Sequence, residues 1–369
     1  MSVGSGPRFG IEEEFLVVDR RSRAVVPRAG VVIGRAKEVL GERIGGEITK
    51  LQIEARTDPC RTVAEAVGQL EQARGVLAEA ADRDGLAVVA TGTPVLGDFV
   101  PPAMTTGPRQ DRGNETFRGL HDELAICALH VHVEIPDREQ AVLAGNHLRP
   151  WLPTLIALGA NSPFWAERDT GYASWRTMIW TRWPVAGPPP FFSSAEHYDR
   201  TVEMLHEVGS VVDVGTIFWD LRPSAHVPTL EVRVSDVPMT ARDSVMTAAL
   251  IRALTVDALA KVAAGDPGPQ VGAEVLRLAY WRAARDGLTG SGIDPVTGRL
   301  VPAAALVESL VAVARPALED GGEADAVASW LKELIHGGDG AARQRAAAAD
   351  RGSLGDVVDV LIEQTAGAH

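Results

Sequence analysis

The sequence predicts an α+β protein built on a mostly antiparallel β-sheet. Four segments alternate ionisable and apolar residues with the two-residue period of a strand. Their charges gather on one side and their apolar residues on the other, which predicts helices against the apolar face and an acidic cavity on the opposite face. From residue 241 onward the pattern changes to helices joined by turns rich in Gly, Asp and Pro.

Size and composition limit the classes of protein. A chain of 369 residues, 46% hydrophobic and 23% charged, forms either two domains or one large one. The net charge of −13 argues against a general nucleic-acid binder and is compatible with carboxylates gathered around divalent metals. Two cysteines, Cys60 and Cys127, predict neither a disulfide framework nor a cysteine zinc site.

We expect a cytoplasmic protein without a membrane partner. No apolar run approaches the length of a membrane span, and Met1–Gly6 lacks the charged and apolar regions of a signal peptide.

The first expected strand, residues 10–19, carries three consecutive acidic residues. Because side chains alternate along a strand, Glu12 and Glu14 share one face, while Glu13 joins Ile11 and Phe15 on the other. Two like charges are costly to bury without cations. An exposed edge strand that carries charges against aggregation is the competing interpretation of this segment alone.

The second expected strand lies within residues 47–58 and carries Glu47 and Glu54. Seven residues separate these two glutamates, so a regular strand would place them on opposite faces. A bulge, or a position for Glu47 in the preceding loop, would bring both into one site. Glu54 is therefore the better candidate ligand.

The third and fourth expected strands carry histidine, glutamate and arginine. Residues 127–137 alternate so that His130, His132 and Glu134 share one face. A solvated antiparallel face is the alternative interpretation. Residues 228–236 place Glu231, Arg233 and Ser235 on one face and Leu230, Val232 and Val234 on the other.

The remaining elements follow from periodicity, caps and breakers. An amphipathic helix begins near Thr62, and Pro150 and Pro153 break the helix predicted over 138–158. Further predictions are a short strand at 24–27, a short helix or irregular segment at 31–40, a buried strand at 86–90, a long loop at 98–113, and helices at 195–209, 241–264, 271–286, 303–313, 324–335 and 354–365. We expect the arginines of the long loop, Arg109 and Arg112, to be solvated.

One polar stretch predicts a pocket. Residues 161–176 mix aromatic side chains with hydroxyl, amide and guanidinium groups, each of which would demand a partner if buried.

The carboxylates and imidazoles of the four expected strands, without thiolates, favour Mg²⁺ or Mn²⁺ over structural zinc. Arg176, Arg222 and Arg233 would supply fixed positive charge for a phosphate or a carboxylate. The sequence has no glycine-rich loop of the P-loop type.

An ordered set of motifs resembles the type 2 glutamate–cysteine ligase family, the ATP-dependent carboxylate–amine ligases of bacteria. The matching blocks are Phe9–Phe15, His130–Val133, Ala160–Trp165, Asp169–Tyr172, Trp219–Ser224 and Thr229–Arg233. The resemblance implies one domain over residues 1–369, with a glutamine-synthetase-like sheet folded as a bowl and its site mainly in 8–240. The helical part, 241–369, packs outside it.

The resemblance also implies a site and a reaction. Metal ligands are expected at Glu12, Glu14, Glu54, His130 and Glu231, with Glu47 a weaker match. Arg233 matches a phosphate-facing arginine, and Arg176, Arg222 and His132 match neighbouring substrate or nucleotide contacts. The implied reaction activates the γ-carboxylate of glutamate with ATP and transfers it to an amine, cysteine in the type reaction. ATP and Mg²⁺ are the implied cofactors, Mn²⁺ a substitute, and a homodimer the expected assembly.

Three alternatives stay open. Ala128-Leu129, Glu167, Lys50 and Arg56 depart from the family's pattern, and Lys50 and Arg56 leave open the same chemistry with an amine acceptor other than cysteine. A zinc-dependent hydrolase that uses His130 and His132 is disfavoured, because the later histidines follow no strand pattern. A non-catalytic nucleotide-binding descendant would be expected to have lost a carboxylate, and Glu12, Glu14, Glu54 and Glu231 are all present.

Overall fold

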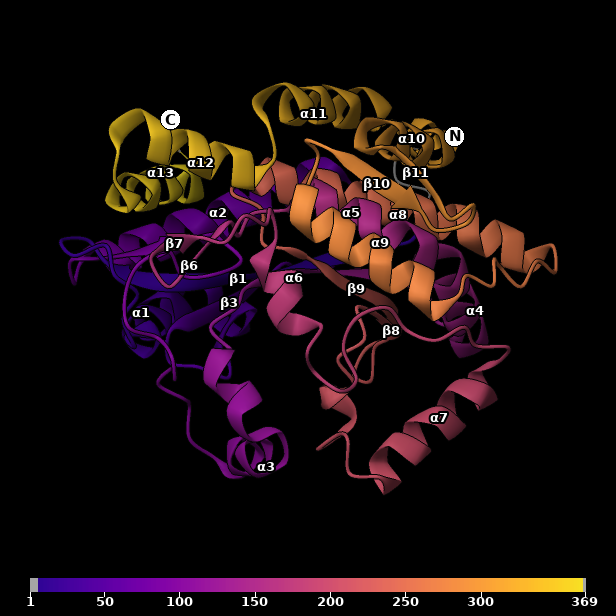
Figure 1. Cartoon of the computed structure of the whole chain (residues 1–369), viewed down its shortest axis with the longest axis horizontal. Helices are drawn as coiled ribbons and strands as arrows, with labels where there is room; N and C mark the ends of the chain where they lie inside the picture. The colour runs from indigo at the N-terminus through magenta and orange to yellow at the C-terminus, as the bar shows by residue number, and fades with distance from the viewer. Residues whose placement is uncertain (1–5, 368–369) are drawn as a thin grey trace.

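A seven-stranded antiparallel sheet organises the protein (Figure 1). The computed structural model describes residues 6–367, so most of the segment tested for a signal peptide lies outside it. The strand order is β2-β3-β1-β5-β9-β8, with β4 also paired to β1. The bounds are β1 (Phe9–Asp19), β2 (Ile44–Gly46), β3 (Gln52–Arg56), β4 (Leu86–Val89), β5 (Ala128–Glu134), β8 (Leu221–Pro223) and β9 (Thr229–Asp236).

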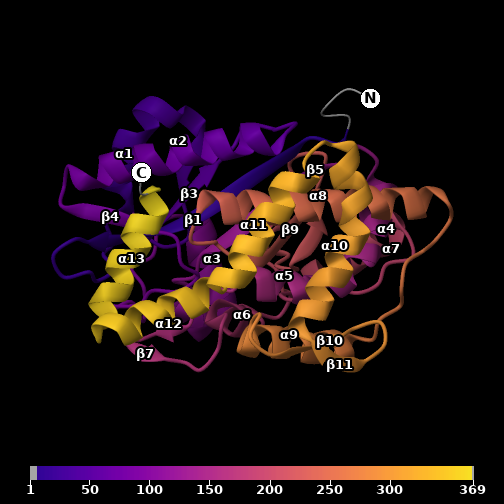
Figure 2. The ribbon, with the colours of Figure 1, turned by 90° about the horizontal axis from the view of Figure 1, so that it is seen from above.

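Helices cover one face of this sheet in two layers (Figures 1 and 2). Those in contact with the strands or with one another are α1 (Ala29–Leu40), α2 (Val63–Asp82), α4 (Arg138–Leu148), α5 (Leu152–Gly159), α8 (Ala241–Ala263), α9 (Ala273–Asp286), α10 (Ala303–Asp320), α11 (Ala324–Gly337), α12 (Gly340–Arg351) and α13 (Leu354–Ala366). Apolar residues of β1, β5 and β9 form one continuous core with α8 and its neighbours. The predicted α+β class, with helices on the apolar face, is confirmed.

Shorter helices and 3₁₀ turns connect these elements. They are α3 (Pro108–Phe117), α6 (Trp175–Trp180), α7 (Ala195–Glu207) and the 3₁₀ turns η1 (Gly41–Arg43), η2 (Arg118–Glu123), η3 (Arg149–Trp151) and η4 (Val214–Thr216). Two hairpins complete the fold: β6 (Phe164–Trp165) with β7 (Arg168–Asp169), and β10 (Ser291–Asp294) with β11 (Arg299–Pro302). No helix among the described residues is both long and apolar enough to cross a bilayer.

Several predicted elements need correction. The expected strand at 24–27 is a single bridge between Val18 and Val25. The expected loop at 98–113 contains the start of α3, which has Pro108 at its first turn, a position that needs no backbone donor. The helix α12 lies in an alanine-rich stretch to which no helix was assigned. By contrast, the Thr62 cap and the break around Pro150 are confirmed.

The strand β1 is central, which excludes the edge-strand interpretation. Its neighbours are β3 and β5. Glu13 points into the helical layer as alternation predicts, but it is fully buried and forms an ion pair with Arg74 of α2 at 2.6 Å. The hydroxyl of Ser244, on α8, also donates to the Glu13 carboxylate at 2.5 Å. Glu13 therefore joins the sheet to two helices and takes no part in the acidic face.

Candidate active site

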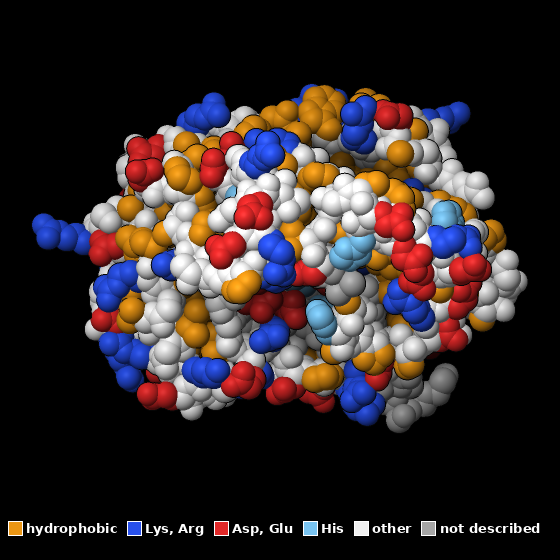
Figure 3. Space-filling model, turned by 90° about the horizontal axis from the view of Figure 1, so that it is seen from below, with side chains coloured by type: hydrophobic (Ala, Val, Ile, Leu, Met, Phe, Trp, Pro, Cys, Tyr) orange, Lys and Arg blue, Asp and Glu red, His pale blue; other side chains and the backbone are white. Residues whose placement is uncertain are grey.

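The face of the sheet opposite the helical layers carries the ionisable side chains. Figure 3 shows this face hollowed, with acidic side chains in the recess and basic and histidine side chains around it. The strands β1, β3, β5 and β9 each contribute to it, as the sequence predicts.

The strand register explains why these residues meet. Glu12 lies directly opposite His130 on β5, and Glu14 lies opposite Glu54 on β3. On the next ladder His132 faces Glu231. Directly paired side chains on one face of a sheet have Cβ atoms about 5 Å apart, so the register alone brings these groups together.

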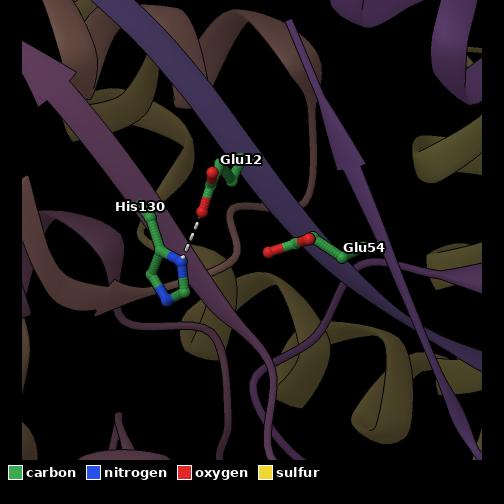
Figure 4. A group of neighbouring side chains, drawn as sticks. All are labelled: Glu12, Glu54 and His130. Carbon is green, nitrogen blue, oxygen red and sulfur yellow. Dashed lines mark hydrogen bonds and ion pairs between the residues drawn. The ribbon is translucent and has the colours of Figure 1, made fainter. Parts of the chain in front are cut away.

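Three of these residues form a compact cluster that could hold a cation, called the acidic group below. One ligand atom from each of Glu12, Glu54 and His130 lies within 4.8 Å of the others (Figure 4). The Nδ1 atom of His130 is 3.1 Å from a Glu12 oxygen. Among the described residues this is the one cluster with at least three such ligand atoms. It contains two carboxylates and a single imidazole. That set of ligand atoms suits Mg²⁺ or Mn²⁺ better than Zn²⁺, and so argues against the zinc-dependent hydrolase.

Glu14 and Glu47 lie at the margin of this group. Glu14 is buried, accepts a hydrogen bond from the Ala128 amide at 2.7 Å and lies 3.7 Å from the Nε2 atom of His130. Glu47 follows β2 and precedes β3, so it lies in the loop before β3, which is one of the two arrangements that its spacing from Glu54 left open. Its negative charge raises the pKa of both Glu14 and Glu54.

The carboxylates oppose one another's ionisation. Burial, reinforced by the charges of Glu47, Glu12 and Glu14, raises the pKa of Glu54 to about 9. Burial also raises the pKa of Glu14 and of Glu47. Burial acts on Glu12 in the same direction, but the adjacent His130 and His132 outweigh it and lower its pKa. A bound cation would relieve this mutual repulsion.

Both histidines leave a nitrogen without a partner. The Nδ1 atom of His132 lies 2.9 Å from the Thr229 hydroxyl, and that of His130 contacts Glu12. Within the described residues, neither buried Nε2 atom has a hydrogen-bond partner. Buried nitrogens without hydrogen-bond partners, beside a group of carboxylates, fit the requirements of a divalent cation.

Glu231 is held by two arginines. The Nε atom of Arg222 donates to it at 2.9 Å, and the Nη1 atom of Arg233 lies 3.2 Å from its other oxygen. Burial alone would raise the pKa of Glu231, but Arg222 and Arg233 lower it to about 2. The three residues form a charged wall beside the acidic group, and the guanidinium of Arg233 lies 5.3 Å from the centre of the Trp180 ring.

A bulge in β9 places Arg176 and corrects the prediction for Ser235. Ser235 pairs with Leu129 but Val232 pairs with Val131, so β9 has one more residue than β5 in this interval. The extra residue reverses the alternation, and the Ser235 hydroxyl donates to a carbonyl of α5 instead of facing the site. Arg176 is buried and donates to the carbonyls of Arg233 and Val234, at the bulge itself.

The two ends of the polar stretch 161–176 are largely buried in the core, at 161–165 and 173–176, and its middle forms an exposed hairpin, which corrects the predicted pocket. Its amide and hydroxyl groups find buried partners, chiefly Asp236 at the end of β9. The Asn161 side chain donates to the carbonyls of Ala90 and Val237. This network fixes the strand that carries Glu231 and Arg233.

Asp220 is a buried acid that the sequence analysis missed. It accepts a hydrogen bond from the Trp180 indole at 2.9 Å, and its carbonyl accepts one from the Arg233 amide. Burial raises its pKa to about 6 although Arg176 and Arg233 oppose the shift. A lone carboxylate inside the apolar run 214–221 is the signal that could have identified it.

A cleft of about 250 Å³ adjoins the acidic group at the ends of β1, β5 and β9. Glu12 and His132 border it on the site side, and Phe9, Pro59 and Pro228 supply apolar walls. The ion pair of Arg8 with Glu134, 2.6 Å long, lies at its edge. Glu134, predicted on the histidine face, is thus engaged outside the acidic group.

The fold is that of glutamate–cysteine ligases. A solved glutamate–cysteine ligase from Francisella tularensis, in complex with AMP, superposes with a TM-score of 0.69 at 13% sequence identity and covers 98% of this chain and 88% of its own. The predicted glutamine-synthetase-like class is therefore confirmed at the level of architecture.

The chain belongs to glutamate–cysteine ligase family 2, whose model matches residues 8–360. A relative from Mycobacterium sp. (strain KMS), provisionally named glutamate–cysteine ligase 2-2, is 44% identical over 97% of this chain and 98% of its own length. A Nocardia farcinica relative, provisionally named glutamate–cysteine ligase 2-1, is 44% identical over 97% of this chain and 92% of its own length. The family predicted from the motifs is confirmed.

Proposed function

We propose that this protein is an ATP-dependent ligase that joins the γ-carboxylate of glutamate to the amine of a second amino acid. The observation that carries the proposal is that the acidic group on β1, β3 and β5 lies beside the charged wall of Arg222, Glu231 and Arg233 on β8 and β9, on one face of the sheet. Family membership supports the same chemistry.

The reaction has two balanced steps. The γ-carboxylate attacks the γ-phosphate of ATP, which gives an acyl phosphate and releases ADP. The amine then attacks the acyl carbon, loses its proton and expels phosphate, so that an amide forms. Neither step needs a protein nucleophile. The residues must instead bind, orient and neutralise charge.

The acidic group would hold one or more divalent cations. We assign this role to Glu12, Glu14, Glu54 and His130, with Glu47 and Glu231 as flanking ligands. Bound Mg²⁺ or Mn²⁺ would neutralise phosphate charge. Their fit rests on the raised pKa of Glu54, to about 9, and on the unpartnered His130 nitrogen.

The arginines would bind the anionic groups. Arg233 and Arg222 lie beside Glu231 and are suited to phosphate oxygens, because a guanidinium offers paired donors. His132, between Glu12 and Thr229, would contact the nucleotide. We infer that Arg176 acts indirectly by holding the β9 bulge beneath Arg233, rather than by touching the substrate.

The decisive experiment measures ADP release with glutamate, Mg²⁺ and a panel of amino acids and amines, with product mass as a second readout. We expect release that depends on both substrates and on the metal. It should fall at least a hundredfold in Glu231→Gln, since the variant removes the charge that orients two arginines. Glu203→Gln, on the exposed surface of α7, is the matched control. If no acid and amine pair provokes ADP formation, the ligase proposal is wrong.

The same panel identifies the acceptor. Cysteine is the acceptor named for relatives. Arg56 borders the cleft beside the acidic group, and it departs from the family's pattern. We propose that this cleft admits the acceptor and that its identity depends on these contacts. A cytoplasmic location and a homodimeric state remain predictions, which fractionation and mass photometry would test.

A further inference from the structure

Trp180, the last residue of α6, is a buried aromatic residue beside the charged wall on β8 and β9. The helix α6 contacts β9 and lies beside it in Figure 1. The centre of the Trp180 ring is 5.3 Å from the guanidinium of Arg233, which lies over the ring. A guanidinium in this position is attracted by the negative face of the indole. The ring therefore faces the arginine to which we assign phosphate binding.

Arg233 has few hydrogen bonds that could fix its orientation. Among the residues that the structure describes, its side chain makes one, from Nη1 to Glu231 at 3.2 Å, and its buried Nε atom has no partner. Arg222 differs, because it donates to both oxygens of Glu231 and to two backbone carbonyls. Hydrogen bonds thus hold all three nitrogens of Arg222, whereas the planar group of Arg233 depends on the face of Trp180.

The Trp180 ring is itself fixed by Asp220. Its indole N–H donates to a carboxylate oxygen of Asp220 at 2.9 Å. The backbone carbonyl of Asp220 accepts from the Arg233 amide at 2.8 Å, so one residue holds both the ring and the strand that carries the arginine. The Phe218 ring, 5.0 Å from that of Trp180, packs against the same side chain. The contacts therefore run from the Arg233 backbone, through Asp220 and Trp180, back to the Arg233 guanidinium.

A second arginine contacts the same ring but does not depend on it. The Arg176 guanidinium lies 5.8 Å from the centre of the Trp180 ring. It also donates to the carbonyls of Arg233 and Val234, so it keeps fixed partners without the ring. Loss of the ring would therefore free the side chain of Arg233 and not that of Arg176.

We propose that Trp180 is a positioning residue for the ligase reaction, whose indole face orients the Arg233 guanidinium while Asp220 holds the indole N–H. This inference rests on the proposed function, in which Arg233 binds phosphate oxygens. A guanidinium that is free to rotate must be ordered each time the transition state forms, and this requirement lowers the rate. Trp180 acts through Arg233, so its removal should lower kcat more than it raises the KM for ATP.

Steady-state ADP release tests the proposal, with ATP, Mg²⁺, glutamate and the amine that is fastest in the panel above. Trp180→Leu removes the aromatic face and should lower kcat about tenfold, with the KM for ATP within about threefold of wild type. Trp180→Phe keeps an aromatic face for the guanidinium and should recover most of the loss. Trp281→Leu is the matched control and should leave kcat unchanged. The Trp281 indole also donates to a hydroxyl, at 3.1 Å, and its ring also contacts an arginine, at 4.6 Å, but it lies on α9 in the helical layers.

A double variant decides whether Trp180 acts through Arg233. Arg233→Met removes the guanidinium, so adding Trp180→Leu to it should change kcat by less than about twofold. Urea unfolding checks that each protein is folded, and Trp180→Met replaces Trp180→Leu in the comparison if the leucine variant is not. Equal losses from Trp180→Leu with and without Arg233, or from Trp180→Leu and Trp180→Phe, overturn the inference but not the proposed function. Absence of ADP release from wild type with every acid and amine pair overturns the proposed function, and the inference with it.

Discussion

At the residue scale, the role of a charged side chain depends on which residues lie next to it in the folded protein. Glu12, Glu13 and Glu14 are adjacent in sequence but have three different environments: a histidine pair, a buried arginine and a crowded acidic group. Strand alternation correctly separated Glu13 from the other two. Alternation could not predict Arg74 as its partner, because that contact depends on how α2 packs on the sheet.

Glu54 should make the metal-free protein less stable as the pH rises between the pKa values of this carboxyl in the unfolded and folded states. Its pKa in the folded protein is raised to about 9, above the value of about 4.5 in an unfolded chain. The folded state therefore holds a proton that the unfolded state releases, and stability falls as pH rises through this window. Glu54→Gln should remove this loss and stabilise the EDTA-treated protein by about 2 kcal/mol at pH 8.

Urea unfolding in EDTA at pH 6 and pH 8 measures this effect. Glu203→Gln is the control, because its exposed carboxyl lies outside the acidic group. A Glu54→Gln variant that loses as much stability as wild type between the two pH values would contradict the prediction. The same variant should bind Mn²⁺ more weakly, since it lacks one ligand oxygen.

At the element scale, the strands were predicted and their irregularities were not. The alternating patterns located β1, β3, β5 and β9 and the face on which most of their charges lie. The bulge in β9 depends on its pairing with β5, so no pattern within β9 could indicate that Ser235 would turn away. The polar stretch near Asn161 failed as a pocket for a similar reason, since its partners come from β9 and other distant segments.

The buried Glu13–Arg74 pair should be a strong link between β1 and α2. Arg74 donates to both oxygens of Glu13, at 2.9 and 2.6 Å, and to two carbonyls that precede α8. Arg74→Met leaves the Glu13 charge buried and unpaired, and should lower the free energy of unfolding by about 3–5 kcal/mol. Chemical denaturation measures the change.

A double variant distinguishes the pair from simple packing. Glu13→Gln/Arg74→Met removes both charges and should cost less than the sum of the two single variants. Arg83→Met, an exposed position at the end of the same helix, should change stability by less than about 0.5 kcal/mol. Strict additivity of the two single changes would show that the charges do not interact.

At the scale of the whole molecule, motif order predicted more than local patterns did. The spacing of acidic strands indicated a sheet with one charged face, and the ordered blocks identified the family and hence the bowl. The covering elements were less predictable. The helix α3 has few apolar residues, and its two buried residues, Gly113 and Phe117, pack against His121 and against aromatic side chains distant in sequence.

The architecture predicts that divalent cations stabilise the folded protein and that the choice of cation reports the class of site. An unfolded chain cannot hold Glu12, Glu54 and His130 together, so binding free energy adds to folding free energy. Saturating Mg²⁺ or Mn²⁺, at about a hundred times the dissociation constant, should add about 2.7 kcal/mol to the EDTA-treated protein. The gain should shrink toward pH 5, where protons compete for the ligands. Thermal unfolding with each cation, together with elemental analysis of the purified protein, makes the measurement. Tightly held stoichiometric zinc, with no stabilisation by Mg²⁺ or Mn²⁺, would contradict an oxygen-ligand site and favour a histidine-centred one.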